Sequence, residues 1–391
     1  MTGKPTSSGK LPSSQGHVSL AAADRSLSDA VAAPGAGIQD FIDWVLSALR
    51  RGDLAEAEQR LNRARARWNT TNWAPLESEV LMMGRDYQRA ASLIAAALPT
   101  ARDANEAALL KELKFEADLM RAIAARIKLH DKRAESDDLA VYAINLDENA
   151  ERWERISRLV TPRSLHRIGG VPGRYLADGV VKRFGPQASP HFKGTLGCFL
   201  AHYAAWEAHL KSTEPHALVL EDDCLPLIDI PRSGASLMLP ADFDICFLTN
   251  GLGVLGSERA ATEMLPIYRP LADSVAERAA QLLAPGGYGY VLSRRGAEQL
   301  IARVDEDGFF GDVDWRMIAY CLPRHAVDGY PQASFARGVL SAHLQVIVPR
   351  PPLAGFCCYP GLVKPGRIGS VRERDNERRH AHLWIETAGG T

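Results

Sequence analysis

The sequence predicts an α/β sandwich with a largely parallel central sheet, preceded by an all-α segment. Two observations support this fold class. Before about residue 130, apolar residues recur at the spacing of one helix face. From residue 139 onward, short apolar runs typical of buried strands alternate with helical patterns, an order that favours a parallel sheet covered by helices. At 391 residues, the chain is long enough for two structured units.

Residues 1–37 are rich in Ser, Gly, Ala and Pro and show no hydrophobic periodicity, which predicts a disordered leader. A helical domain is expected over residues 38–130. One pattern of large and small residues returns there after 33 residues (54 to 87), close to the period of about 34 of tetratricopeptide helix pairs. The two matching stripes are Leu54, Ala57, Leu61 and Ala64, and Tyr87, Ala90, Ile94 and Ala97.

This tetratricopeptide-like segment has two interpretations, which the sequence supports equally. The segment is either a partner-docking or oligomerising module, or a helical extension that packs on the domain that follows. A last helix from about Asn105 to His130 would cover the exposed edge of the stack, since repeat units need a neighbour that buries their apolar face. The charged residues 131–138 are predicted to be a linker, and a second domain is predicted over residues 139–391. That domain begins with a buried strand at 139–146. The other predicted elements are helices near 148–159, 195–211 and 296–304 and strands at 216–220 and 243–249.

Composition argues against several classes of protein. The formal net charge is −1, without the basic excess that nucleic-acid-binding proteins usually show. No apolar run is long enough to span a bilayer and no signal peptide is evident, so we expect a cytoplasmic protein or one peripheral to the inner face of the membrane. The six cysteines form no C-x-x-C pair, which suits a reducing compartment.

Three consecutive carboxylates end the apolar run ALVLEDD at residues 217–223. Because strand ends face the ligand crevice of open α/β sheets, Glu221, Asp222 and Asp223 are expected where a substrate binds. Their mutual repulsion is relieved most easily by Mn²⁺ or Mg²⁺, which prefer oxygen ligands and keep coordination positions open for phosphate oxygens. The alternative is a solvated acidic turn.

The helix expected before this strand places His202 and Cys198 beside its apolar stripe. A histidine in such a position is more often a packing residue than a catalyst. The i, i+4 spacing of Cys198 and His202 also permits a zinc site with Cys224, which we disfavour because no fourth soft ligand is indicated.

Four segments together resemble glycosyltransferase family 25, which includes bacterial lipooligosaccharide galactosyltransferases and the collagen galactosyltransferases. They are VYAINLDENAERWERI (141–156), GTLGCFLAHYAAW (194–206), ALVLEDDC (217–224) and GGYGYVLSRRGAEQLI (286–301). With a closing segment they cover residues 139–376 in the family's order. The resemblance implies a GT-A fold, a UDP-sugar donor, a divalent metal, and transfer of a hexose with inversion, galactose by default, to a saccharide or glycolipid acceptor such as lipooligosaccharide.

The resemblance also implies which residues meet the nucleotide. Asn145, Leu146 and Asp147 lie at the end of the first strand, where the nucleotide of such enzymes rests. Arg152 matches the arginine of the same motif, and a guanidinium suits a diphosphate because it is permanently charged and bidentate. For the neighbouring Arg155, a surface position is a serious alternative.

The acidic motif corresponds to the family's counterpart of D-x-D. We expect Asp223 to bind the metal, Glu221 to contact metal or ribose, and Asp222 to lie in the nucleotide site. Gly286 and Gly287 would let the backbone approach the sugar, with Tyr288 lining the same pocket.

An inverting transfer needs a general base near the acceptor hydroxyl. Asp312 and Asp314 are the candidates and Asp314 is preferred, although either one is also suited to cap the following helix. The chain departs from the family pattern at Thr195 and Ala201, which weakens inferences about sugar or acceptor contacts. Basic residues near the C-terminus suggest either a lid over the diphosphate or a plain basic tail; they are Lys364, Arg367 and Arg372, beside the family's serine at Ser370.

Two rival functions remain open at this point. A nucleotidyltransferase would also place acids at a strand end, but no G-x-x-x-x-G-K-[ST] loop is present. The other rival is a catalytically inactive scaffold that binds a protein partner through its N-terminal helices.

Overall fold

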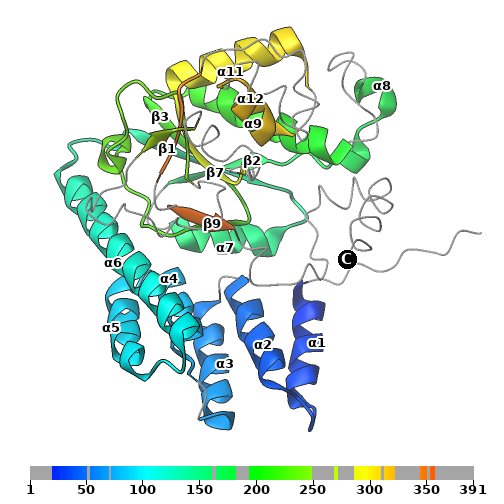
Figure 1. Cartoon of the computed structure of the whole chain (residues 1–391). Coiled ribbons are helices and arrows are strands. Elements are labelled where there is room, and N and C mark those ends of the chain that lie inside the picture. Colours follow the sequence, from blue (N-terminus) through cyan, green and yellow to red (C-terminus); the bar gives the residue numbers. More distant parts are fainter. Residues whose placement is uncertain are drawn as a thin grey trace, which may run out of the picture.

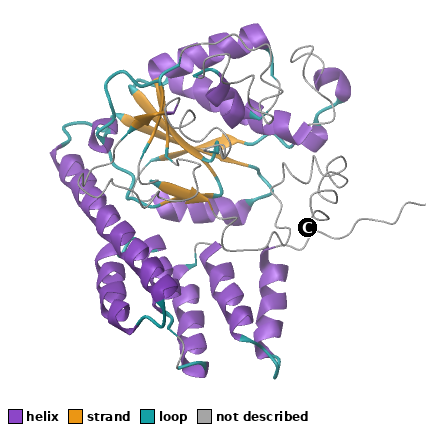
Figure 2. Ribbon diagram, viewed as in Figure 1, coloured by secondary structure: helices purple, strands orange, loops and turns teal. Residues whose placement is uncertain are grey.

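The computed structural model describes residues 20–50, 53–69, 72–160, 164–181, 193–248, 268–271, 286–309, 312–321, 344–349 and 353–356. Within these ranges the fold is an α/β sandwich with a stack of helices packed beneath it (Figures 1 and 2). No helix in the described part of the chain has the length and apolar character needed to cross a membrane.

The N-terminal stack consists of six α-helices in the described residues. They are α1 (Leu20–Ala32), α2 (Ile38–Arg50), α3 (Leu54–Arg67), α4 (Ala74–Met83), α5 (Tyr87–Ala97) and α6 (Ala104–Arg133), with a 3₁₀ turn, η1 (Leu98–Thr100), before α6. Both predicted stripes face the interior of the stack, and their buried members are Ala57, Leu61, Ala64, Tyr87, Ala90 and Ile94. The tetratricopeptide-like character of the repeat stays a prediction.

The two copies of the repeat begin in the same way. The side chain of Asp53 accepts a hydrogen bond from the backbone N–H of Glu56 at the start of α3. Asp86 accepts one from Arg89 at the start of α5. Aspartate at the N-cap satisfies an amide that has no partner within the helix, so the repeated aspartate marks where each second helix begins.

Helix α1 lies within the range predicted to be a disordered leader, so that prediction is wrong for residues 20–32. Val31 is buried against α2, and the indole Nε1 of Trp44 donates a hydrogen bond of 3.0 Å to Ser28 Oγ. Few large apolar residues mark this helix, which is why hydrophobic periodicity did not predict it.

The central sheet has seven strands in the described residues, in the order β2-β1-β3-β7-β5-β8-β6. Their bounds are β1 (Leu139–Asn145), β2 (Leu165–Gly169), β3 (His216–Glu221), β5 (Ile245–Phe247), β6 (Arg269–Pro270), β7 (Gly289–Ser293) and β8 (Val346–Val348). Strands β2, β1, β3, β5 and β8 share one direction, whereas β7 and β6 run antiparallel to their neighbours. A second sheet pairs β4 (Cys224–Pro226) with β9 (Ala354–Phe356).

The predicted, largely parallel sheet is therefore confirmed for five strands, and β7 is an antiparallel insertion that the sequence analysis did not include. The predicted strands at 139–146, 216–220 and 243–249 correspond to β1, β3 and β5.

Helices cover both faces of the sheet. α9 (Lys193–Lys211), α11 (Arg294–Asp307) and α12 (Val313–Ala319) lie on one face, and α7 (Ala150–Val160) lies on the other, between the sheet and the helical stack (Figure 1). Side chains alternate accordingly: Val219 packs with Trp206 of α9, whereas Leu218 packs with Ile156 of α7. The remaining short helices are η2 (Gly173–Tyr175), α8 (Asp178–Val181) and η5 (Gly234–Leu237).

Helix α6 joins the stack to the sandwich through a common hydrophobic core. Ile123 and Ile127 are buried in the same cluster as Leu139 and Val141 of β1. The predicted linker is also anchored, because the Asp138 carboxylate accepts a hydrogen bond of 2.7 Å from the Gly234 N–H. Of the two interpretations of the stack, the structure therefore shows packing on the following domain; a protein partner remains untested.

Candidate functional site

The predicted site lies where β1 and β3 end side by side. Ile144 is paired with Glu221 in the parallel register, so Asn145 and the acidic turn 222–223 emerge at the same edge of the sheet. Helix α7 begins five residues after β1 and places Arg152 in its first turn. At this edge, the carboxylates that follow β3 therefore lie near the guanidinium of Arg152, on the helix that follows β1.

Asp222 connects these elements. Its Oδ2 accepts a hydrogen bond of 2.7 Å from Asn145 Nδ2, and its Oδ1 accepts one of 3.1 Å from Arg152 Nη1. Arg155 Nη2 donates to the Asp222 backbone carbonyl, so this arginine is buried and the surface position considered for it is wrong. Because both oxygens of the buried Asp222 carboxylate have partners, its clearest role is to hold the β3–β4 turn against β1 and α7.

Asn145 is held equally firmly from the other side. Its Oδ1 accepts hydrogen bonds from Arg167 Nε at 3.1 Å and from Arg167 Nη2 at 2.8 Å. Arg167, on β2, also pairs with the exposed Asp147 at 2.7 Å, and its guanidinium lies over the Trp153 ring. Arg167 was not among the predicted site residues, because β2 was not predicted and the contact spans 22 residues.

Leu146, predicted in the same nucleotide site, lies against Gly170. A Cβ on that glycine would come within 2.8 Å of Leu146 Cδ2, so a side chain there would displace Leu146.

Asp223 differs from its neighbour in having an unsatisfied oxygen. The residue is 5% exposed, its Oδ2 lies 3.5 Å from Arg152 Nη1, and its Oδ1 has no hydrogen-bond partner. Burial, reinforced by the charge of Glu221, raises the pKa of Asp223 to about 7, against the opposing effect of Arg152. A buried carboxylate with an unpaired oxygen is costly unless a cation or donor completes it, so Asp223 fits the expected metal ligand.

The side chain of Glu221 contacts α9. Its side chain is 28% exposed, and its Oε1 lies 3.3 Å from Nε2 of the fully buried His202. The ring of His202 contacts the Tyr290 hydroxyl, which also accepts a hydrogen bond from Trp206 Nε1. The three acids thus diverge: Glu221 faces α9, whereas Asp222 and Asp223 face Arg152 of α7.

The predicted glycines surround Glu221. A Cβ on Gly287 would lie 3.2 Å from Glu221 Oε1 and 3.5 Å from His202 Nε2. Gly286 has a φ of +81°, and a Cβ there would lie 2.0 Å from the Tyr288 ring. Gly286 therefore requires glycine for reasons internal to the protein, whereas a side chain at Gly287 would need only a small shift of Glu221; contact of either glycine with a sugar stays a prediction.

The zinc alternative considered from sequence does not form as stated. The structure brings Glu221, and not Cys224, to Cys198 and His202, with one potential ligand atom from each residue within 4.8 Å of the others. Cys224 instead borders Gly289, where an added Cβ would lie 3.1 Å from its sulfur.

The two candidate bases lie at the start of α12, on the same face of the sheet as His202 and Glu221. Asp312 occupies the N-cap position without a side-chain capping bond, and Asp314 Oδ1 accepts a hydrogen bond of 2.9 Å from the Trp315 N–H. α12 is anchored by Val313 and by other side chains in the core shared with α9. A role as base remains a prediction for both aspartates. The C-terminal residues Lys364, Arg367, Ser370 and Arg372 lie outside the described residues.

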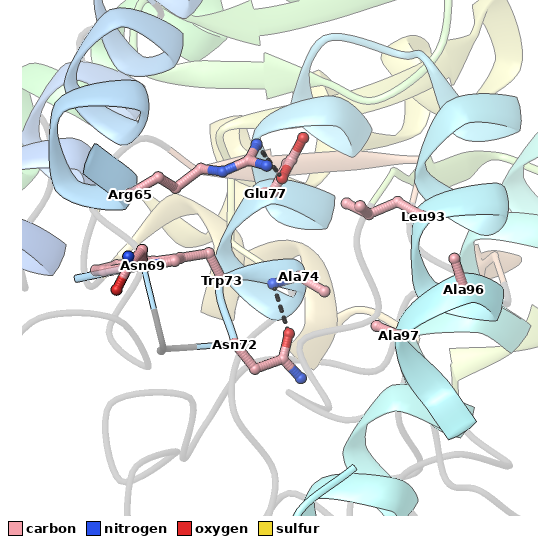
Figure 3. Close-up of a pocket in the computed structure, with 9 residues that line it drawn as sticks. All are labelled: Arg65, Asn69, Asn72, Trp73, Ala74, Glu77, Leu93, Ala96 and Ala97. Carbon is pink, nitrogen blue, oxygen red and sulfur yellow. Dashed lines mark hydrogen bonds and ion pairs between the residues drawn. The ribbon is translucent and has the colours of Figure 1, made fainter. Parts of the chain in front are cut away.

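A separate cavity of about 520 Å³ opens in the helical stack (Figure 3). Arg65 of α3 and Glu77 of α4 form an ion pair of 2.9 Å at its wall, and Leu93 of α5 faces it from the opposite side. The cavity lies between α3, α4 and α5, and the hydrophobic pattern of the sequence did not predict it. Its lining residues are Arg65, Asn69, Asn72, Trp73, Ala74, Glu77, Leu93, Ala96 and Ala97.

Comparison with known proteins supports the resemblance found in the sequence. The chain is 28% identical over 181 residues to "Procollagen galactosyltransferase 1" of Danio rerio, covering 41% of this chain and 28% of that protein. It is 26% identical over 249 residues to a "Glycosyltransferase 25 family member" of Anopheles gambiae, covering 58% of this chain and 37% of that protein. No family model matches the chain.

A third relative bears on catalytic competence. The chain is 26% identical over 178 residues to "Probable inactive glycosyltransferase 25 family member 3" of Bos taurus, covering 41% of this chain and 28% of that protein. Each of these matches spans well under half of the relative's own length. The expected similarity to glycosyltransferase family 25 is confirmed.

Proposed function

We propose that this protein is a metal-dependent glycosyltransferase with a GT-A type sandwich, which moves a hexose from a UDP-sugar to a saccharide acceptor. The observation that carries the proposal is Asp223, a buried carboxylate with an unpaired oxygen at the edge where β1 and β3 end. Similarity to galactosyltransferases supports galactose as the default donor sugar.

A divalent cation, Mn²⁺ or Mg²⁺, would be held by Asp223 and by Glu221. Both offer hard oxygen ligands, and burial, reinforced by the charge of Glu221, raises the pKa of Asp223, which supports a site that an added positive charge would stabilise. When bound, the cation would offset the charge that develops on the departing nucleotide diphosphate.

Arg152 is the protein's own cation at this edge. Its Nη1 lies between Asp222 and Asp223, at 3.1 and 3.5 Å, which fixes the guanidinium beside the diphosphate position that we propose. Asn145 supports Asp222 from β1, while Leu146, Asp147 and Tyr288 remain proposed nucleotide or sugar contacts.

The finer features of the reaction belong to the same proposal. Asp314 is the preferred general base and Asp312 the alternative, which would make the transfer inverting. A lipooligosaccharide-type glycolipid is the acceptor we favour, and the N-terminal helices offer a surface for a protein partner.

The relative named as inactive makes a binding scaffold the second candidate function. A scaffold would retain the fold but lose metal-dependent turnover.

The two candidates are separated by calorimetric titration of the full chain with UDP in Mn²⁺ and in EDTA, followed by hydrolysis assays with several UDP-sugars. Glycosyltransferase function predicts Mn²⁺-dependent UDP binding and hydrolysis of at least one donor. Asp223→Ala should abolish the metal-dependent binding, whereas Glu154→Gln, on the exposed side of α7, should leave it unchanged. Binding without any hydrolysis would favour the scaffold, and no binding would refute the proposal.

A further inference from the structure

Three side chains form a buried hydrogen-bonded triad behind Glu221, and neither the sequence analysis nor the proposed metal site accounts for it. Trp206, Tyr290 and His202 are all fully buried. Trp206 Nε1 lies 2.8 Å from Tyr290 Oη, which in turn lies 2.9 Å from His202 Nδ1. The other ring nitrogen of the histidine reaches Glu221 Oε1 at 3.3 Å.

The secondary structure fixes this arrangement. His202 and Trp206 are one helical turn apart on α9, so both face the sheet. Tyr290 lies on β7 directly opposite Val219 of β3, two residues before Glu221. Elements that are far apart in the sequence therefore hold the triad against the end of β3, and no member can turn toward solvent.

The donors and acceptors determine the state of the histidine ring. An indole N–H only donates, so Tyr290 Oη accepts from Trp206 and keeps its single proton for another partner. Donation of that proton to His202 Nδ1 leaves the ring proton on Nε2, where it meets the Glu221 carboxylate. The opposite tautomer would set a bare nitrogen against a carboxylate oxygen, which is repulsive.

Burial supports the same assignment. It raises the pKa of Tyr290 well above its ordinary value, so the hydroxyl retains its proton. Buried polar groups are costly when unsatisfied, and this tautomer satisfies every contact of the triad.

We propose that His202 is a positioning residue: its Nε2–H aims the Glu221 carboxylate toward the cation site, and Tyr290 and Trp206 hold the ring in the required tautomer. This positioning role rests on the proposed function, in which Glu221 contacts a metal. Gly287 lies beside this carboxylate, since an added Cβ there would come within 3.2 Å of Glu221 Oε1.

The first test measures the ring directly and needs no metal. In protein labelled with ¹⁵N-histidine, the His202 signals are assigned by their loss in His202→Gln, and their shifts report which nitrogen is protonated. We expect a protonated Nε2. A bare Nε2 would overturn the proposal.

The second test measures metal affinity by Mn²⁺ titration monitored by electron paramagnetic resonance. Groups that orient metal ligands typically contribute about 10- to 100-fold in affinity, so His202→Ala should raise the half-saturating Mn²⁺ concentration by about that factor. His202→Gln, which keeps an N–H near the Nε2 position, should recover most of the loss, and Tyr290→Phe should give a smaller increase. UDP affinity at saturating Mn²⁺ should be close to that of the wild type.

The matched control is His209→Gln, a buried histidine on the same helix that contacts Ser212 instead of the acidic turn. It should not change Mn²⁺ affinity. Equal Mn²⁺ affinity for His202→Ala and wild type would overturn the positioning role.

Direct metal binding by the cluster of Cys198, His202 and Glu221 would also overturn it, because His202 would then be a ligand. Its signature is a Co²⁺–thiolate absorption band that Cys198→Ser abolishes. A wild-type protein that binds no Mn²⁺ would refute the proposed function and, with it, the metal-directed role of the triad. The ¹⁵N spectrum would still show whether the hydrogen bonds of the triad form.

Discussion

Replacing Asp223 by asparagine should stabilise the metal-free protein while removing the carboxylate that we propose as a metal ligand. An ordinary aspartate has a pKa of 3.8, and burial followed by repulsion from Glu221 raises the pKa of Asp223 to about 7. The folded state therefore binds a proton more tightly than the unfolded state does. As pH rises from about 4 toward 7, the folded protein loses stability, and above 7 the penalty is constant.

The magnitude follows from that displacement of the pKa. A difference of about three pH units corresponds to a penalty on the order of 4 kcal/mol at pH 8, and the penalty is smaller at pH 5, where the folded state still binds the proton. Asparagine has nearly the same shape and no charge, so Asp223→Asn removes most of this penalty. The substitution also weakens the 3.5 Å contact between Asp223 Oδ2 and Arg152 Nη1, which reduces the gain in stability.

The assay is urea-induced unfolding of wild type and Asp223→Asn in EDTA at pH 5 and pH 8, repeated with Mn²⁺. In EDTA the variant should be the more stable protein at pH 8, and its advantage should shrink at pH 5. Mn²⁺ should stabilise the wild type and leave the variant unchanged, because a ligand stabilises only the state that binds it. An Asp223→Asn protein that is less stable than wild type at pH 8 would refute the reasoning.

Three further substitutions probe the structure. Asp222→Asn should lower the free energy of unfolding by about 1–3 kcal/mol, because it breaks charge-assisted hydrogen bonds with Asn145 and Arg152. The effect should therefore be opposite in sign to that of Asp223→Asn in EDTA. Urea unfolding that shows no loss of stability would contradict the hydrogen-bond network. Ile123→Ala should lower the free energy of unfolding by about 2–5 kcal/mol in the same assay, because Ile123 is buried in the core shared with the sandwich. The control Leu129→Ala, at an exposed position of the same helix, should lower it by less than about 0.5 kcal/mol. Equal losses for the two variants would disprove the shared core. Gly286→Ala should lower the melting temperature measured by circular dichroism and Gly35→Ala should not, since an added Cβ meets the Tyr288 ring at the first position and open space at the second.

The sequence predicted the elements that carry a regular local pattern. The apolar runs of β1 and β3 and the stripes of α7, α9 and α11 appear where expected, and so does the edge that brings Asn145 near the acidic turn. Strand β7 was missed because it is five residues long and follows two glycines, so it carries little periodicity. β7 lies between β3 and β5 and runs antiparallel to both, and a local sequence pattern does not determine such strand order.

The candidate site was predictable in its residue types but not in its connections. Adjacency of the three acids suggested one cluster, yet Glu221 contacts His202 of α9, whereas Asp222 and Asp223 lie beside Arg152 of α7. Asn145 and Arg152 were identified from a motif, but their shared partner, Asp222, depends on contacts across 77 and 70 residues. His202 was taken as a packing residue because its partner Tyr290 lies 88 residues away.

The core that α6 shares with the sandwich has a consequence for biosynthesis. Ile127 leaves the ribosome 110 residues ahead of Leu237, with which it is buried in the finished protein (127 to 237). Until then the part of α6 that packs on η5 lacks its final cover, since contacts distant in sequence form late. A nascent polypeptide arrested between these points should therefore be a client for chaperones, and its release should require the residues up to Leu237 to emerge.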